Sequence, residues 1–374
     1  MLEAGPATAG ARVGTTACGI LHSLAAAPQR VAGTRMPSDS ASIAATAGRF
    51  WLALIAASAI FLPSHAYTVR DLYTAAVPRE RGAAGNDAGF AAAMEVVLVK
   101  VTGLEDAAAR MRGALPNARV YVQRYGIDAE GRLEVGFDPS AIDRLITDAG
   151  LPIWGRERPA TLVLARLEPT EGPAEWLAAD SAAPAREMID AAADLRGVPL
   201  VWPLMTVREQ SVVRAFDARA PDPAALAELA ARYRANAVLL ATLSANAAGE
   251  VSGAWTLGFG EETASRSGGP LQGIALAAEQ FAGAYATSAI DVTTVDISVA
   301  GITNLEAYAR TLDYLEKLSV TEAVAVEEIS GETLRLRLAL RGDPATFARS
   351  VALDDQLVPL DTLQPGRLAY RFQP

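Results

Sequence analysis

Carboxylates are the side chains of this chain best suited to chemistry, because the residues that build most catalytic and metal sites are confined to its first 66 positions. Both histidines, His22 and His65, and the single cysteine, Cys18, lie there. Ser-His-Asp and Cys-His catalysis need an imidazole to take up a proton, and zinc-type clusters need His or Cys. Glycoside hydrolysis needs only two carboxyl groups flanking a bond. Candidates for such a pair are Asp138, Asp143, Glu261 and Glu262.

These carboxylates and the two lysines also have simpler structural interpretations. Asp138 precedes a proline, an order typical of a helix N-cap, and Glu261 and Glu262 open a polar turn after an apolar strand pattern. Lys100 and Lys317 fall in the last turns of expected helices, where a cation stabilises the negative end of the helix dipole. No S-x-x-K, G-x-S-x-G or G-x-x-x-x-G-K-[ST] motif occurs. The sequence therefore predicts no catalytic residue, no metal ligand and no cofactor.

Three tryptophans could form an aromatic surface for a glycan or a small molecule: Trp154, Trp202 and Trp255. Each stands in an apolar stretch (LPIWG, LVWPL or GAWTL), where tryptophan usually fills a core or a seam between domains, so core packing is favoured. Trp154 is expected to plug a hinge between two modules, with Arg156 and Arg158 as surface charges beside it.

A basic strand face is a different kind of candidate. From Thr333 to Arg341 leucines alternate with Arg335, Arg337 and Arg341, which places the arginines on or beside the exposed face. This face could bind an acidic protein or an anionic glycan. The alternative is a solvated face, or an edge strand that charge keeps soluble.

The segment Arg49–Ala66 has the three parts of a secretory signal peptide. One arginine supplies positive charge, Phe50–Leu62 is a 13-residue apolar run, and Ser and Ala occupy the small positions before a cleavage site after Ala66. A proline closes the run well short of the roughly 20 residues that span a bilayer, which favours cleavage over retention as an anchor. Residues 1–48 are interpreted as a disordered leader or as the product of a start codon assigned too far upstream.

The chain that remains after cleavage is acidic. Residues Tyr67–Pro374 number 308 and carry 29 basic and 41 acidic side chains, a net charge near -12 compared with -10 for the whole sequence. Such a surface argues against nucleic acid or anionic membrane as the main partner. We expect a periplasmic protein without a membrane span, stabilised by packing alone, whose partners are envelope proteins.

Apolar periodicity predicts an α+β fold with mixed or antiparallel sheets packed by helices. Three modules are expected, at residues 67–157, 158–290 and 291–374. Less regular segments of the first two are interpreted as strands at 67–77, 118–125 and 198–204, and as a surface loop at 168–183. The third module has the order β-α-β-β-α-β, which is ferredoxin-like.

Several motifs of the first two modules carry a family resemblance. They are YTVRDLYTAAVP, LVKVTG, VYVQRY and GLPIWGRERP, followed by ARYRANAVLLATL and GAWTL. Together they resemble a bacterial exported family catalogued as domain of unknown function 2066, over residues 67 to about 290. The resemblance implies an exported envelope protein and supplies no catalytic residues. The later motifs are also similar to small domains of outer-membrane lipoproteins and assembly accessories.

Three hypotheses for function follow. The first is a non-enzymatic periplasmic protein that acts by protein-protein contact in envelope assembly or maintenance. The second is a binding protein for a small molecule or glycan in a cleft between modules, which a deep pocket lined by Trp154 or Trp202 would favour. The third is a carboxylate-dependent hydrolase, which two carboxyl groups about 5 to 9 Å apart in an open groove would favour.

Overall fold

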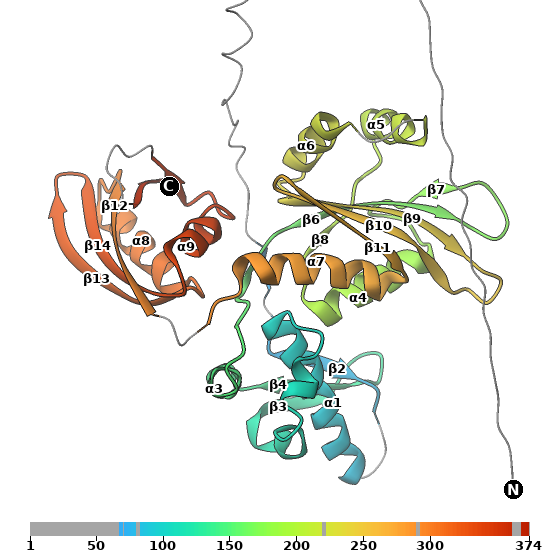
Figure 1. Cartoon of the computed structure of the whole chain (residues 1–374), viewed down its shortest axis with the longest axis horizontal. Coiled ribbons are helices and arrows are strands. Elements are labelled where there is room, and N and C mark those ends of the chain that lie inside the picture. The colour runs from blue at the N-terminus through green and yellow to red at the C-terminus, as the bar shows by residue number, and fades with distance from the viewer. Residues whose placement is uncertain are drawn as a thin grey trace, which may run out of the picture. The chain divides into compact units, whose positions relative to one another are not determined.

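The computed structural model describes residues 67–69, 71–79, 83–218, 222–288, 292–360 and 368–373. These described residues all belong to one unit of the chain. The predicted leader and signal peptide, with its cleavage site, lie outside the described residues and stay predictions. Within the described ranges, no helix is long and apolar enough to cross a membrane. The fold is α+β, with mixed and antiparallel sheets packed by helices, as predicted (Figure 1).

The N-terminal module contains a three-stranded antiparallel sheet in the order β2-β4-β3. The helix α1 packs on this sheet and buries Phe90, Met94, Val97, Leu98 and Val101, the face that the 3.6-residue period predicts. The elements are β2 (Thr74–Val77), α1 (Ala83–Thr102), α2 (Ala107–Arg110), the 3-10 helix η1 (Leu115–Tyr121), β3 (Val122–Ile127), β4 (Leu133–Phe137) and α3 (Pro139–Asp148).

Two strand predictions in this module are wrong. The predicted strand 67–77 is two strands, because the chain turns between them and buries Leu72 in that turn. Its first part, β1 (Tyr67–Thr68), pairs with β5 (Glu157–Arg158), whereas β2 pairs with β4. The predicted strand 118–125 starts only at β3, because a proline in the first turn of η1 favours helical backbone angles.

The central module is a mixed six-stranded sheet in the order β11-β10-β9-β6-β7, with β8 beside β6. Its parallel core pair is β6 and β9, and α4 and α7 cover one face while α5 and α6 lie on the other (Figure 1). The elements are β6 (Thr161–Glu168), β7 (Glu175–Trp176), α4 (Pro184–Arg196), β8 (Leu200–Val201), α5 (Val207–Ala218), α6 (Pro223–Arg232), β9 (Ala237–Ala245), β10 (Val251–Phe259), β11 (Glu262–Gly268) and α7 (Pro270–Tyr285).

Corrections in this module concern short or polar elements. The predicted strand 198–204 is reduced to the two residues of β8, because prolines flank it and cannot donate to a ladder. The predicted surface loop 168–183 contains β7, which pairs with the end of β6. Neither α5 nor β11 is expected from the apolar pattern.

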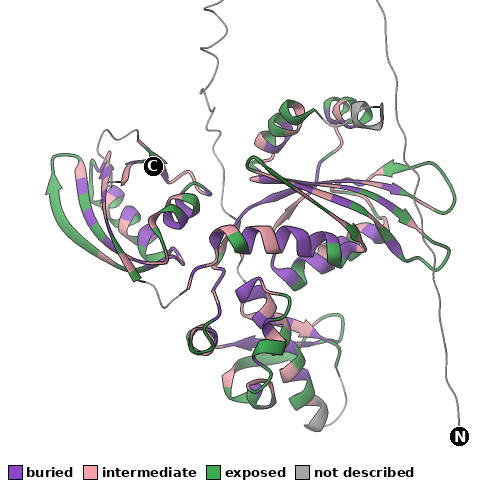
Figure 2. Ribbon diagram, in the orientation of Figure 1, coloured by how far each residue is buried: buried purple, intermediate pink, exposed green. Residues whose placement is uncertain are grey.

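The C-terminal module has the order β-α-β-β-α-β-β, one strand more than the predicted ferredoxin-like β-α-β-β-α-β, and its sheet runs β13-β14-β12-β16-β15. β16 is parallel to β12, and the short β15 adds an antiparallel edge, so the sheet is mixed. The leucines of β14 are all buried, whereas most of the edge strand β13 is exposed (Figure 2). The elements are β12 (Val292–Ala300), α8 (Leu305–Lys317), β13 (Thr321–Ser330), β14 (Thr333–Arg341), α9 (Pro344–Val351), β15 (Leu357–Pro359) and β16 (Leu368–Phe372).

Arg158, expected at the surface, is completely buried. Its guanidinium donates to five backbone carbonyls: Lys100 at 2.6 Å, Trp154 at 3.0 Å, Gly155 at 2.9 Å, Arg196 at 3.2 Å and Gly197 at 2.8 Å. It also lies 3.7 Å from the ring centroid of Trp154, a cation-π contact. Burial lowers the pKa of Arg158 to about 9, so the side chain stays charged at neutral pH.

The Arg158 cluster is expected to contribute strongly to stability. Arg158→Met leaves five buried carbonyls without their donor, and we expect it to lower the free energy of unfolding by about 3 kcal/mol or more. The matched control is Arg156→Met in the same segment, where the side chain is exposed and the loss should stay below about 1 kcal/mol. Urea unfolding of both variants measures the difference. Equal urea midpoints for the two variants would show that the contacts of Arg158 add no more stability than those of Arg156.

Candidate functional site

The predicted tryptophans lie in cores. Trp154 and Trp255 are fully buried and Trp202 is 8% exposed. The indole nitrogen of Trp202 donates to Asp190 at 2.8 Å. The ring of Trp255 packs so closely on α7 that a Cβ at Gly273 would lie 2.1 Å from it. These side chains stabilise the fold, in agreement with the favoured interpretation, and do not form a ligand surface.

The candidate carboxylates have separate structural roles. Asp138 caps α3, as predicted. Asp143 accepts a hydrogen bond from the Tyr73 hydroxyl at 2.6 Å, and burial together with this carboxylate raises the pKa of Tyr73. Glu261 and Glu262 lie at the exposed turn that joins β10 to β11. Within the described part of the chain, no group of three His, Cys, Asp or Glu side chains is arranged to hold a metal.

The two lysines also have structural contacts. Lys100 Nζ donates to the carbonyl of Thr74 at 3.0 Å, and Lys317 pairs with Asp313 at 2.6 Å. Burial lowers the pKa of Lys100, with the charge of Asp194 opposing that shift.

The three arginines of β14 point to the exposed face of the C-terminal sheet, and each has a carboxylate on a neighbouring strand. This surface is therefore one of mixed charge. The pairs are Arg335 with Glu328 at 2.5 Å, Arg337 with Asp296 at 3.0 Å and Glu327 at 2.6 Å, and Arg341 with Glu322 at 2.5 Å.

The edge strand β3 exposes large apolar side chains. Tyr125 is 61% and Ile127 50% exposed, and Val120 in the last turn of η1 is 77% exposed. The Tyr125 ring rests edge-on against Phe90 of α1, with ring centroids 5.2 Å apart. Among the described strands, only β4 pairs with β3, so its other side is a free sheet edge.

A cleft of about 770 Å³ lies between α5 and α6, a volume typical of ligand pockets. Neither Trp154 nor Trp202 lines it, so it differs from the pocket that the sequence hypothesis required. The lining residues come from the residue before α5, from the first turns of α5 and from α6: Thr206, Val207, Arg208, Glu209, Val212, Ala225, Glu228, Leu229, Ala231 and Arg232.

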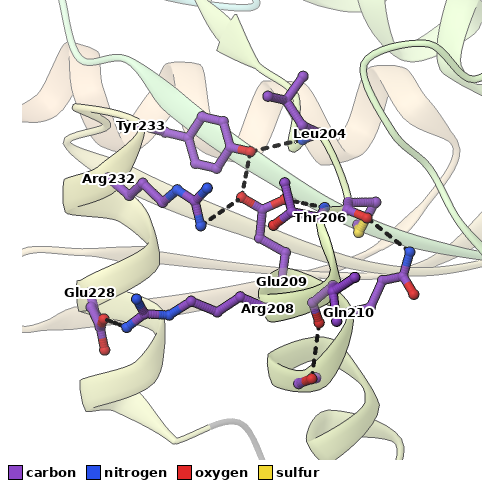
Figure 3. A network of polar contacts seen from close by, with 11 residues as sticks. Leu204, Thr206, Arg208, Glu209, Gln210, Glu228, Arg232 and Tyr233 are labelled. Atoms are coloured by element: carbon purple, nitrogen blue, oxygen red, sulfur yellow. Dashed lines mark hydrogen bonds and ion pairs between the residues drawn. The ribbon is translucent and has the colours of Figure 1, made fainter.

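A buried carboxylate organises this cleft (Figure 3). Glu209 is 1% exposed and accepts hydrogen bonds from the Thr206 N–H at 2.8 Å and from the Tyr233 hydroxyl at 2.7 Å. Arg232 lies 3.4 Å from the same carboxylate. Burial alone would raise the pKa of Glu209, but the hydrogen bonds and the Arg232 charge outweigh burial and hold the pKa below its ordinary value. Glu209 is therefore ionised at neutral pH.

The backbone on both sides of this network is strained. Met205 and Arg234 each have a φ of 52°, and no other non-glycine residue in the described ranges has a positive φ. Met205 precedes Thr206, and Arg234 follows Tyr233. Such a conformation costs about 1 to 3 kcal/mol per residue and concentrates at sites where function needs a particular geometry.

Sequence reasoning missed this cleft because α5 itself was missed. A signal was present, since Thr206 and Glu209 have the T-x-x-E spacing of a capping box. Arg232 and Tyr233 lie at the end of α6, a helix that the sequence predicts. Their partner Glu209 lies on α5, a helix that the sequence analysis did not predict.

Comparison with known proteins adds one finding. A family described as Domain of unknown function (DUF8605) matches residues 66–155. No curated protein and no solved structure gives a significant match. The resemblance to domain of unknown function 2066 is therefore wrong. Its motifs are apolar helix and strand ends next to Gly and Pro turns, and such features are common to many folds, which explains why they did not separate one family from another.

The ionised state of Glu209 gives a pH prediction. Glu209→Gln should lower the free energy of unfolding by about 1 to 2 kcal/mol at pH 7, because charge-assisted hydrogen bonds become neutral ones. Since the folded-state pKa lies below the unfolded value of about 4.3, this stabilisation is complete above about pH 5 and is lost as the pH falls through the folded-state pKa. Urea unfolding at pH 7 and pH 3.5 should show the difference from wild type shrinking in acid.

Glu228→Gln is the matched control, because this carboxylate lines the same cleft but is 69% exposed. Its stability should follow wild type at both pH values. An unchanged difference between wild type and Glu209→Gln across the pH range would contradict the assignment.

Proposed function

We propose that this chain is an exported, non-catalytic protein of the cell envelope that acts by binding another protein, and that the β3 edge is the contact. The observation that carries this proposal is the free edge of β3 with its exposed Tyr125 and Ile127. Natural proteins usually protect a free strand edge with charge, proline or a covering element. An apolar one is typical of a surface that a partner covers.

The geometry of β3 favours an added strand as the mode of binding. An edge strand offers a row of unpaired N–H and C=O groups, to which an extended segment can add as a further strand. On the α1 side of the sheet, this segment would meet Tyr125 and Ile127, whereas Phe90 beneath Tyr125 is only 2% exposed. On the other side it would meet Arg124, whose side chain is 62% exposed although it lies 3.7 Å from Glu134 and donates to the Thr74 hydroxyl at 3.4 Å. The partner segment should therefore alternate apolar and acidic residues.

The placement of the other candidates supports a role without catalysis. Asp138 caps α3 and Asp143 binds Tyr73, while Lys100 donates to the Thr74 carbonyl of β2 and Lys317 pairs with Asp313 of its own helix. The arginines of β14 have carboxylate partners within their own sheet, so an acidic partner would have to displace them. The exposed apolar side chains of β3, Tyr125 and Ile127, can be covered without displacing an ion pair.

Crosslinking in the producing cells, followed by mass spectrometry, tests the contact. We expect the double variant Tyr125→Ser, Ile127→Ser to lose at least nine-tenths of an envelope protein that crosslinks to the wild-type chain, because apolar side chains at the centre of an interface carry most of its binding energy. Both residues are exposed, so the variant should still fold, which circular dichroism checks.

The matched control is Arg335→Ser, Arg337→Ser, which alters an exposed strand face elsewhere and should leave partner recovery unchanged. Recovery lost in the arginine variant but kept in the β3 variant would move the contact to β14. A wild-type chain that crosslinks to no envelope protein would contradict the proposal as a whole.

Export has its own test. Expression in a Gram-negative host, osmotic shock and intact-mass measurement should give a periplasmic protein whose mass corresponds to a chain starting at Tyr67. Cytoplasmic retention of the full-length chain, or a membrane-bound form that keeps residues 49–66, would contradict cleavage after Ala66.

A further inference from the structure

The cleft between α5 and α6 combines a cation that has spare donors with apolar walls. Arg232 lines it with a side chain that is 47% exposed. A guanidinium has five N–H donors, and the described contact of Arg232 is one approach of 3.4 Å to Glu209. Glu209 is already bound by the hydroxyl of Tyr233 and the N–H of Thr206. Most of the donors of Arg232 are therefore available to a group in the cleft.

The other charged pair of the cleft does not compete for that group. Arg208 and Glu228 pair with each other across the two helices, and both side chains are about 70% exposed. Their charges cancel at the rim. Glu209 carries the remaining negative charge, but it is buried behind its own donors. An incoming anion therefore meets Arg232 as the accessible cation that no surface carboxylate neutralises.

Apolar side chains make up the rest of the wall. Val207, Val212, Ala225 and Leu229 line the cleft from both helices. Val207 is 83% exposed at its mouth, whereas Leu229 is 5% exposed and belongs to the core beneath. A ligand that fits must carry an apolar body along these residues and one anionic end at Arg232.

The position of Arg232 is already fixed by contacts within the protein before a ligand binds. Tyr233 accepts from the Leu204 N–H at 2.8 Å and donates to Glu209, which orients the carboxylate beside Arg232. The strained residues Met205 and Arg234 stand at the two ends of this chain of contacts. A preorganised donor loses less entropy when it binds, which is the usual reason for keeping such strain.

From these observations we infer that the α5–α6 cleft binds a small amphipathic carboxylate, such as a medium-chain fatty acid, with the carboxylate on Arg232 and the chain along Val207, Val212 and Leu229. A planar guanidinium suits a carboxylate because it can donate two parallel hydrogen bonds to it. This site is independent of the β3 edge and of any protein partner.

Calorimetric titration of the full chain with decanoate tests the inference. Wild type should bind one decanoate saturably, and decanol, which has the same chain without the charge, should bind at least tenfold more weakly. Arg232→Met should weaken decanoate binding about tenfold, which corresponds to ~1.4 kcal/mol. Arg232→Lys should recover part of the affinity, because it restores the charge without the fork of donors.

Ala225→Trp provides a second variant that fills the cleft without touching any charge, and it should abolish saturable binding. Arg335→Met, far along the chain and outside the cleft, should bind as wild type does. Thermal unfolding of each variant checks that it is folded.

Three results would overturn the inference. If wild type showed no saturable decanoate binding, the proposed site would not exist. If Arg232→Met bound decanoate with wild-type affinity, or if wild type bound decanol as tightly as decanoate, the cleft would not recognise an anion through Arg232. Wild-type affinity in Ala225→Trp places the ligand outside the cleft.

Discussion

One buried guanidinium satisfies backbone carbonyls at the ends of two helices, where the helices themselves provide no partner. The last carbonyls of a helix have no partner within the helix. Arg158 takes the carbonyl of Lys100 in the last turn of α1 and those of Arg196 and Gly197 at the end of α4. Its charge also suits the negative ends of both helix dipoles. A lysine could not replace it, because an ammonium offers three donors where five carbonyls are served.

The two proposed binding surfaces lie where the packing of the fold is less complete. The α4 and α7 face of the central sheet contains the largest core, with Trp154, Trp255 and Phe281 fully buried. The opposite face carries two short helices over a smaller cluster, which leaves the cleft. In the N-terminal module, α1 covers β2 and β4 but leaves much of Tyr125 and Ile127 on β3 exposed. Both proposed surfaces follow from this uneven coverage.

Periodic elements of the fold were predictable, whereas residues held by tertiary contacts were not. The leucines of β14 and the apolar face of α1 follow their periods of 2 and 3.6 residues and are buried as expected. Arg158 next to Trp154 looked like a surface charge, because nothing local shows that two helix ends meet there. The polar strand β11 and the helix α5 lack a clear apolar period, so the cleft could not be placed. Only the T-x-x-E spacing pointed to it.

The number of polar contacts that each arginine makes distinguishes the structural arginines of this chain from Arg232, which is suited to bind a ligand. The sequence holds only two lysines, so arginine supplies nearly all of its positive charge, and a basic side chain is by itself no sign of a site. Arg158 uses every donor on carbonyls, and Arg335 and Arg337 face carboxylates on neighbouring strands at 2.5 to 3.0 Å. Arg232 differs, because its one carboxylate is 3.4 Å away and already bound by Tyr233. An arginine oriented by a buried acid, yet left with donors facing an apolar cleft, has the geometry to hold an anion.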